Sequence, residues 1–188
     1  MSSIAAPFGL RPAYSPSGIV RPGPLVEIAS AAAFDIFQNS PVALDTNGNL
    51  VLPAPGSRAI GTFQGVEYDD TEGRHRVSNR WVANTVATNI RAYYIAAQGS
   101  VVYEIQSDDT LTIAAIGDQF DWTAITGSTV TGLSSVALDA SSAVGAGNNA
   151  GLRVVGLNPA PDNDWGGAFP IVLVQISEHQ FVADEVAI

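Results

Sequence analysis

The sequence predicts a mainly β protein that forms a compact sandwich or barrel with little helix. Its apolar residues come in short runs, and glycine and proline separate these runs at close spacing. No segment carries apolar residues at a 3.6-residue period over three or more turns, which an amphipathic helix would need. Many short apolar runs divided by turn residues are typical of all-β sandwiches and barrels.

Composition limits the classes of protein to which the chain can belong. Its 188 residues are enough for one domain with a sizeable core, and 46% of them are hydrophobic. The 18 acidic residues outnumber the 8 arginines, and lysine is absent, so the net charge is −10. This charge repels nucleic-acid phosphate, so we expect no nucleic-acid partner. No apolar run reaches the roughly 20 residues of a membrane span, so we expect no membrane partner.

The chain has no cysteine, which excludes disulfides and thiolate metal sites. We also expect no secretory signal, because no basic region followed by an apolar block stands at the N-terminus. Both features fit a protein that is made in a reducing cytoplasm.

A proline-rich segment, APFGLRPAYSPSGIVRPGPL, occupies residues 6–25. Proline fixes φ and removes a backbone donor, so this segment can be neither a helix nor a central strand. Its large apolar residues distinguish it from a flexible linker, and they need a surface on the protein's own body or on a neighbour. We expect residues 1–24 to form an extended docking arm and residues 25–188 a single β-rich domain that folds without the arm. The expected contacts of the arm with a partner are Phe8, Leu10, Arg11, Tyr14, Ile19 and Arg21.

Apolar runs and turn residues predict mainly strands and turns in the first half of the domain. We expect a strand over residues 25–28 and one or two helical turns over residues 31–37. Asn47-Gly48 between two apolar runs predicts a hairpin over residues 41–53. Further apolar runs follow at residues 58–68, 89–96 and 101–106.

The second half contains a long stretch of small residues at 123–151, too long for a structureless loop in a compact domain. We expect it to contain a hairpin, formed by residues 129–133 and 136–138, or to pack against a neighbouring subunit. Strands over residues 151–157 and 170–181 close the chain. The unbroken apolar run at residues 171–174 predicts a strand that is covered on both faces.

The polar stretch DDTEGRHRVSNR at residues 69–80 mixes carboxylates with arginines. It is either a solvated loop or a patch of ion pairs between subunits. The residues expected in such a patch are Arg74, Arg76, Arg80, Asp69, Asp70 and Glu72.

Motifs for catalysis are missing from the sequence, which has neither G-x-S-x-G nor H-E-x-x-H. His179 follows Ser177 and Glu178, but neighbours on a strand point to alternate faces and cannot form a triad. We therefore expect a surface or interface histidine. Asp118 and Asp121, like the acidic segment 162–167, lack the further ligands of a calcium loop and are expected to be turns. We expect no catalytic residue, no metal and no cofactor.

Four phrases carry a resemblance over nearly the whole chain: APFGLRPAYSPSGIVRP, FQGVEYDDTEGRHRVSNRW, VVYEIQ and GLRVVGLNPAPDNDWGGAFPIVLVQISEHQF. They resemble small virion proteins of tailed bacteriophages, the head decoration or capsid cement proteins. The resemblance implies a β-tulip-like or jelly-roll-like fold, a homotrimer, and the major capsid protein as partner. It also implies a place on the outer surface of the capsid, after synthesis in the cytoplasm of the host bacterium.

The expected function is therefore structural rather than enzymatic: a trimeric cement that clamps adjacent capsid subunits. The alternative is a head-fibre or tail appendage domain that binds a host receptor or glycan. That alternative would use exposed aromatic residues, for which Trp81, Trp122 and Trp165 are the candidates. Packing of these tryptophans in the core or at a trimer interface is the favoured interpretation.

Overall fold

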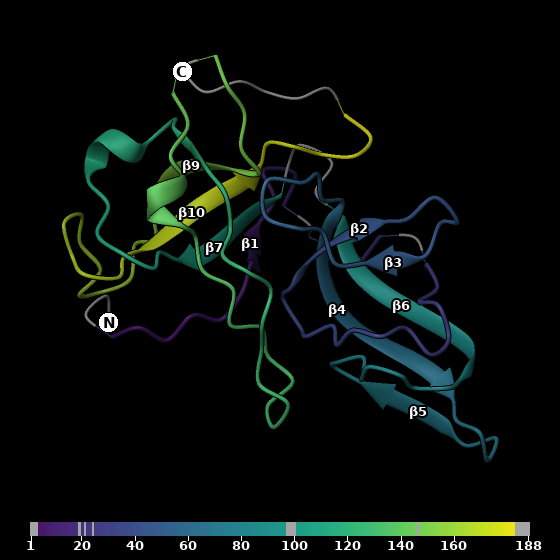
Figure 1. Cartoon of the computed structure of the whole chain (residues 1–188). Coiled ribbons are helices and arrows are strands. Elements are labelled where there is room, and N and C mark those ends of the chain that lie inside the picture. Colours follow the sequence, from purple (N-terminus) through teal and green to yellow (C-terminus); the bar gives the residue numbers. More distant parts are fainter. Residues whose placement is uncertain are drawn as a thin grey trace.

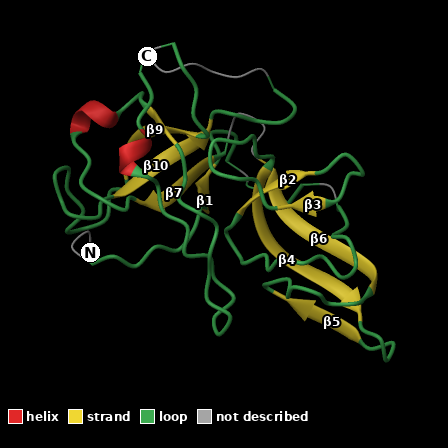
Figure 2. Cartoon of the chain, in the orientation of Figure 1, coloured by secondary structure: helices red, strands yellow, loops and turns green. Residues whose placement is uncertain are grey.

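The structure, a computed structural model, describes residues 4–18, 20, 22–23, 25–96, 101–145 and 147–182 (Figure 1). It is mainly β, and two antiparallel sheets form a compact sandwich-like fold, which confirms the predicted fold class (Figure 2). Within the described residues, helix is confined to two short 3₁₀ turns, η1 (Ile113–Ala115) and η2 (Ala140–Ser142).

The first sheet has five strands in the order β1-β7-β10-β9-β8. These are β1 (Arg11–Tyr14), β7 (Val102–Gln106), β10 (Ile171–Ile176), β9 (Leu152–Leu157) and β8 (Gln119–Phe120). In the central strand β10, Val172 and Val174 are fully buried, whereas Ile171 and Leu173 are half-buried. The apolar run is thus covered completely on one face and partly on the other.

The second sheet is built around β4 (Gly61–Asp69). Its order is β3-β2-β4-β5, and β6 (Thr88–Ala96) also pairs with β4, so that β4 and β6 form a long curved ribbon (Figure 1). The other strands are β2 (Pro41–Leu44), β3 (Leu50–Val51) and β5 (His75–Ser78).

The hairpin predicted from Asn47-Gly48 is confirmed as β2 and β3. The Asp45 carboxylate accepts hydrogen bonds from the backbone amides of Asn47 and Asn49, each at 2.8 Å. Gly48 has a φ of +82°, a backbone conformation that glycine adopts without strain.

Each sheet has its own hydrophobic core. The core of the first sheet includes Leu10, Tyr103, Trp122, Leu138 and Val172. The core of the second sheet includes Ile28, Ile36, Phe63, Trp81 and Ile90.

Two expected elements near the start of the domain are wrong. Residues 25–28 form no strand, although Val26 makes an isolated bridge to Ala92. Residues 31–37 form no helical turn, because Ala31 has a φ of +59° and Ile36 exchanges two backbone hydrogen bonds with Trp81. Pairing with distant residues therefore overrides the local preference of this alanine-rich segment.

The small-residue stretch 123–151 packs against the chain's own body. It contains a tight antiparallel turn in which Gly127 bridges to Ser134, and the expected pairing of residues 129–133 with 136–138 is wrong. Leu133 bridges to Gln38, while Leu138 bridges to Ser107 and Trp122. Small residues are required here, because a Cβ atom on Gly151 would overlap the Trp122 ring. The stretch thus closes the first core.

The N-terminal segment also lies along the body, in contrast to the expected arm. Strand β1 pairs with β7, with Arg11 opposite Glu104. Leu10 is 1% exposed and belongs to the first core, so its assignment as a contact with a partner is wrong. Farther upstream, the Gln106 side chain accepts a hydrogen bond from the Ala6 amide and donates one to the Ile4 carbonyl. Proline permits this arrangement because β1 is an edge strand, where a missing donor is tolerated.

Candidate functional site

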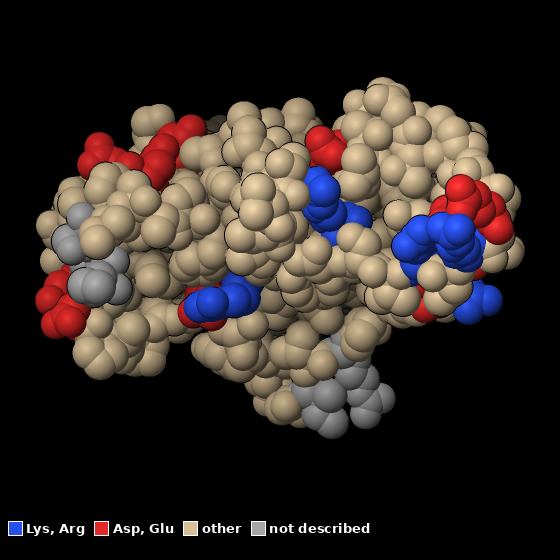
Figure 3. All heavy atoms as spheres, turned by 90° about the horizontal axis from the view of Figure 1, so that it is seen from below, with Lys and Arg blue, Asp and Glu red and all other residues tan. Residues whose placement is uncertain are grey.

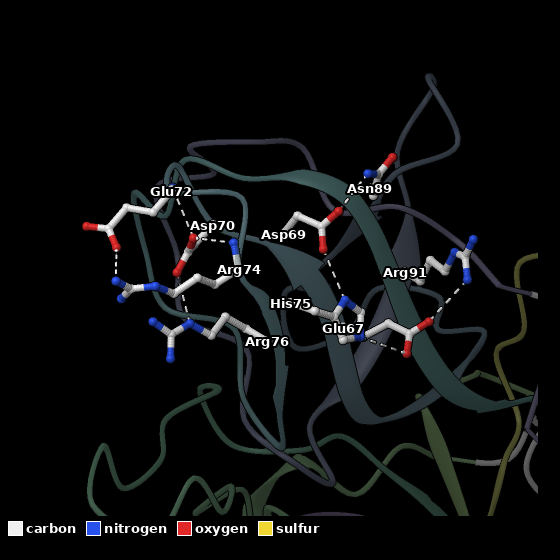
Figure 4. A network of polar contacts seen from close by, with 9 residues as sticks. All are labelled: Glu67, Asp69, Asp70, Glu72, Arg74, His75, Arg76, Asn89 and Arg91. Carbon is white, nitrogen blue, oxygen red and sulfur yellow. Dashed lines mark hydrogen bonds and ion pairs between the residues drawn. The ribbon is translucent and has the colours of Figure 1, made fainter.

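The charged stretch at residues 69–80 comprises the end of β4, the turn between β4 and β5, the whole of β5 and the two residues after it (Figure 4). The Asp70 carboxylate shapes this turn, since it accepts hydrogen bonds from the backbone amides of Glu72 (3.0 Å) and Arg74 (2.9 Å). Gly73 completes the turn with a φ of +75°. The hydrogen bonds, that from the Arg74 backbone foremost, lower the pKa of Asp70 and keep it ionised.

Ion pairs at this turn join residues of the same chain. The Arg74 guanidinium lies 2.7 Å from the Glu72 carboxylate, and the Arg76 guanidinium lies 2.9 Å from that of Asp70. The backbone amide of Arg80 binds the Ser78 hydroxyl at 3.1 Å. Arg74 and Arg76 therefore have counter-charges within the chain itself, and the alternative of ion pairs between subunits stays a prediction.

A second group of polar residues, which we call the outer-face cluster, lies beside this turn on β4, β5 and β6 (Figure 4). It consists of Glu67, Asp69, His75, Asn89 and Arg91, which line a shallow cavity of about 360 Å³. His75 Nδ1 lies 3.0 Å from Asp69, Asn89 donates to Asp69 at 2.7 Å, and Arg91 lies 3.4 Å from Glu67. The cluster is a surface of mutually compensated hydrogen-bonding groups.

Of these five residues, only Asp69 was among those expected in the patch. The signal available was the alternation along β4, because Glu67 and Asp69 are two residues apart and face the same side. Asn89 and Arg91 reach them through the pairing of β4 with β6, where Glu67 faces Arg91. Hydrogen bonds from Asn89 and then His75 lower the pKa of Asp69.

Asp118 ends a turn, in which its amide donates to the Ala115 carbonyl (3.1 Å), whereas Asp121 follows β8 and is not in a turn. Carboxylates at these acidic positions bind the backbone of other segments. Asp121 accepts a hydrogen bond from the Gly151 amide at 2.9 Å, and Asp108 accepts one from the Ala140 amide at 2.9 Å. In the segment 162–167, the buried Asn163 side chain donates to the carbonyls of Asn158 and Ile171, both at 2.8 Å. Among the residues that the structure describes, no group of three or more histidine or acidic side chains is placed to hold a metal ion.

The segment around His179 connects the two sheets. His179 bridges to Ala59, and the Gln180 side chain both donates to and accepts from the backbone of Leu44. Ser177 donates to the Ala150 carbonyl, so Ser177 and His179 have different partners and form no triad. His179 is 3% exposed within the single chain, so the expected surface or interface histidine is wrong.

Acid is expected to destabilise the protein through His179. Its Nδ1 atom accepts a hydrogen bond from the Phe181 amide (3.1 Å), and its Nε2 atom lies 3.3 Å from the Ile60 carbonyl, so the ring is neutral. Burial lowers the pKa of His179 from its ordinary value of 6.5. Below pH 6.5 the unfolded chain therefore binds a proton that the folded chain excludes, and stability falls as the pH drops through the lowered pKa.

The measurement is urea unfolding between pH 7.5 and pH 5, with His75→Gln as the background because it leaves His179 as the one histidine. In this background, His179→Gln should flatten the pH dependence in that range. An unchanged slope after that substitution would show that other groups cause the acid sensitivity.

The three tryptophans occupy different environments. Trp81 and Trp122 are 0% and 1% exposed, which confirms that these two pack in the cores. Trp165 is partly buried against the first core.

The residues expected to contact a partner differ in how exposed they are in the structure. Phe8 is half-buried beneath the Arg11 guanidinium, whose Cζ atom lies 4.5 Å from the ring centre. Arg11 pairs with Glu104 at 2.5 Å, and Tyr14 is 48% exposed. Ile19 and Arg21 lie outside the described residues.

No protein-family model, curated protein or solved structure matches this chain. Within the described residues, the structure contains no helix that is long and apolar enough to cross a membrane.

Proposed function

We propose that this protein is a trimeric capsid cement on the outer surface of a tailed-phage head, where it clamps adjacent major capsid protein subunits. The resemblance of the quoted phrases to head decoration proteins suggests this role, and the mainly β fold is compatible with it. A net charge of −10 also suits a protein that is displayed in many copies on a soluble particle.

The observation that carries the docking part of this proposal is the position of β1 at the edge of the first sheet. An edge strand has backbone groups that an extended segment of a partner can pair with, while side chains provide specificity. On β1, Arg11, Ala13 and Tyr14 are exposed beside this edge. A loop of the capsid protein that adds to β1 would contact Tyr14 and the Arg11 guanidinium.

The proposal is tested with phage heads that lack the protein, from a phage that encodes this chain. Added protein should co-sediment with the heads, appear as density on their outer surface, and raise the temperature at which they release DNA. Heads that bind no protein would overturn the proposal.

Docking through β1 predicts a specific loss of affinity. Tyr14→Ala should weaken binding to heads about tenfold or more, because it removes an exposed aromatic contact at the edge. Ile116→Ala is the matched control, since Ile116 is 47% exposed and lies outside β1. Equal affinities of the two variants would exclude β1 as the docking edge.

A further inference from the structure

The loop at residues 127–134, which we call the knob, has a conformation fixed by hydrogen bonds and exposes an apolar side chain to solvent. It is the green loop that points down from the middle of the molecule in Figure 1. Val130 is 93% exposed. Ser128 holds the loop in this conformation. Its amide donates a hydrogen bond to the Leu133 carbonyl (2.9 Å), and its hydroxyl accepts hydrogen bonds from the amides of Val130 and Thr131.

The base of the knob is fastened to the rest of the chain. Gln38 exchanges backbone hydrogen bonds with Gly132 (2.8 Å) and Ser134 (2.9 Å), and the Asn79 side chain donates to the Thr131 carbonyl at 3.0 Å. Gly132 has a φ of +73°, which favours glycine, and a Cβ atom there would displace the Asn79 side chain. A loop held in this way loses little conformational entropy when its tip binds a partner.

An apolar groove lies next to the knob on the outer face of the second sheet. It has a volume of about 370 Å³, and its walls come from β4, β5, β6 and the segment before the domain. On one side of the groove is Val77 of β5, which is 76% exposed, and on the other side is Tyr93 of β6. Gly65 of β4, the strand between them, also lines the groove. The lining residues are Pro22, Gln64, Gly65, Val66, Val77, Ser78, Asn79 and Tyr93, and none of them is charged.

The distribution of charge on the chain indicates that a second copy covers the knob and the groove. Two copies of a chain with net charge −10 repel each other, so they can associate closely only where charge is absent or compensated. Residues 122–138 contain no charged side chain, and neither do the groove residues that the structure describes. Figure 3, which views the molecule from below, shows that most of this face is uncharged and that charged side chains form a few separate groups.

The knob and the groove are also neighbours, because Asn79 supports the knob and lines the groove. The exposure of Val130 shows that the knob does not fill the groove of its own chain. Because the knob and the groove lie close together on one surface, the knob of one copy can occupy the groove of another. This contact is either reciprocal, in a two-fold pair, or runs in one direction round a closed ring.

We propose that Val130 of one copy inserts into the groove between Val77 and Tyr93 of a second copy. The inference rests on the proposed function in that it supplies a contact for the expected trimer. The contact is apolar against apolar, and it buries the most exposed valine of the described chain.

Sedimentation equilibrium of the full chain tests this contact. Val130→Asp should raise the dissociation constant between copies at least about tenfold, because the carboxylate would be buried without a partner. Val86→Asp is the matched control: Val86 is 58% exposed, lies outside both surfaces, and acquires the same charge. Val130→Asp with unchanged association, or wild-type protein that stays monomeric at all concentrations, would overturn the inference.

Cross-linking tests the same contact directly, since the chain has no cysteine of its own. A tagged Val130→Cys variant mixed with an untagged Val77→Cys variant should give a disulfide-linked pair of tagged and untagged chains on oxidation. Val86→Cys in place of Val130→Cys should give none, and absence of the first product would also overturn the inference.

Binding to phage heads is measured separately, so the two proposals can fail independently. A chain that is monomeric in solution but coats heads would overturn the knob contact alone. A chain that associates through the knob but never binds heads would overturn the proposed function alone.

Discussion

Replacing Gly61 with alanine is expected to lower the free energy of unfolding by about 3 kcal/mol or more, or to prevent folding. Gly61 begins β4, where it pairs with Val42 of β2 and Ala96 of β6. A Cβ atom at this position would overlap the carbonyl oxygen of Ile95. This obstacle is the backbone of the paired strand β6, so it cannot rotate away as a flexible side chain could.

Gly156→Ala is the control for this substitution. Gly156 lies in β9, and a Cβ atom there would meet nothing within 4 Å. Alanine at such a site should change stability by less than about 1 kcal/mol, with a gain from the reduced freedom of the unfolded chain. Urea unfolding followed by the fluorescence of the tryptophans in both cores gives the comparison. Equal unfolding midpoints for the two variants would contradict the close approach of β4 and β6 at Gly61.

The sequence predicted those elements that are specified locally. Asn47-Gly48 and the Asp45 carboxylate set the β2–β3 hairpin within a few residues, so the pattern was sufficient. The segment 31–37 was misassigned because its conformation depends on Trp81, some 45 residues away along the chain. The stretch 123–151 was misassigned for the same reason, since its bridges reach Gln38 and Ser107.

In the candidate site, too, the locally specified features could be predicted from the sequence, and those that depend on distant residues could not. The turn formed by Asp70 and Arg74 is local, and its charges were recognised in the sequence. The outer-face cluster depends on the register between β4 and β6, which shifts twice, between Phe63 and Gly65 and between Glu67 and Asp69. Such irregularities move side chains relative to the partner strand, and alternation along one strand does not reveal them.

Removing the N-terminal segment is expected to destabilise the first sheet, contrary to the expectation from the sequence. Deletion of residues 1–14 would remove β1 and leave β7 as an edge. It would also remove Leu10 from the core and leave the Glu104 carboxylate without Arg11. Leu10→Ala alone should cost about 2–5 kcal/mol, as is typical of a large side chain that is truncated in a core.

Leu25→Ala is the matched control, because Leu25 belongs to the same proline-rich segment but is 54% exposed. It should change stability by less than about 0.5 kcal/mol. If the deletion and Leu10→Ala both unfold at the wild-type urea concentration, the segment does not pack on its own chain, and the free arm expected from the sequence would stand. If both are destabilised, a truncated protein that fails to bind heads shows only that the first sheet is damaged. Tyr14→Ala then becomes the decisive variant for docking, since it removes an exposed contact and leaves Leu10 and the pairing of β1 in place.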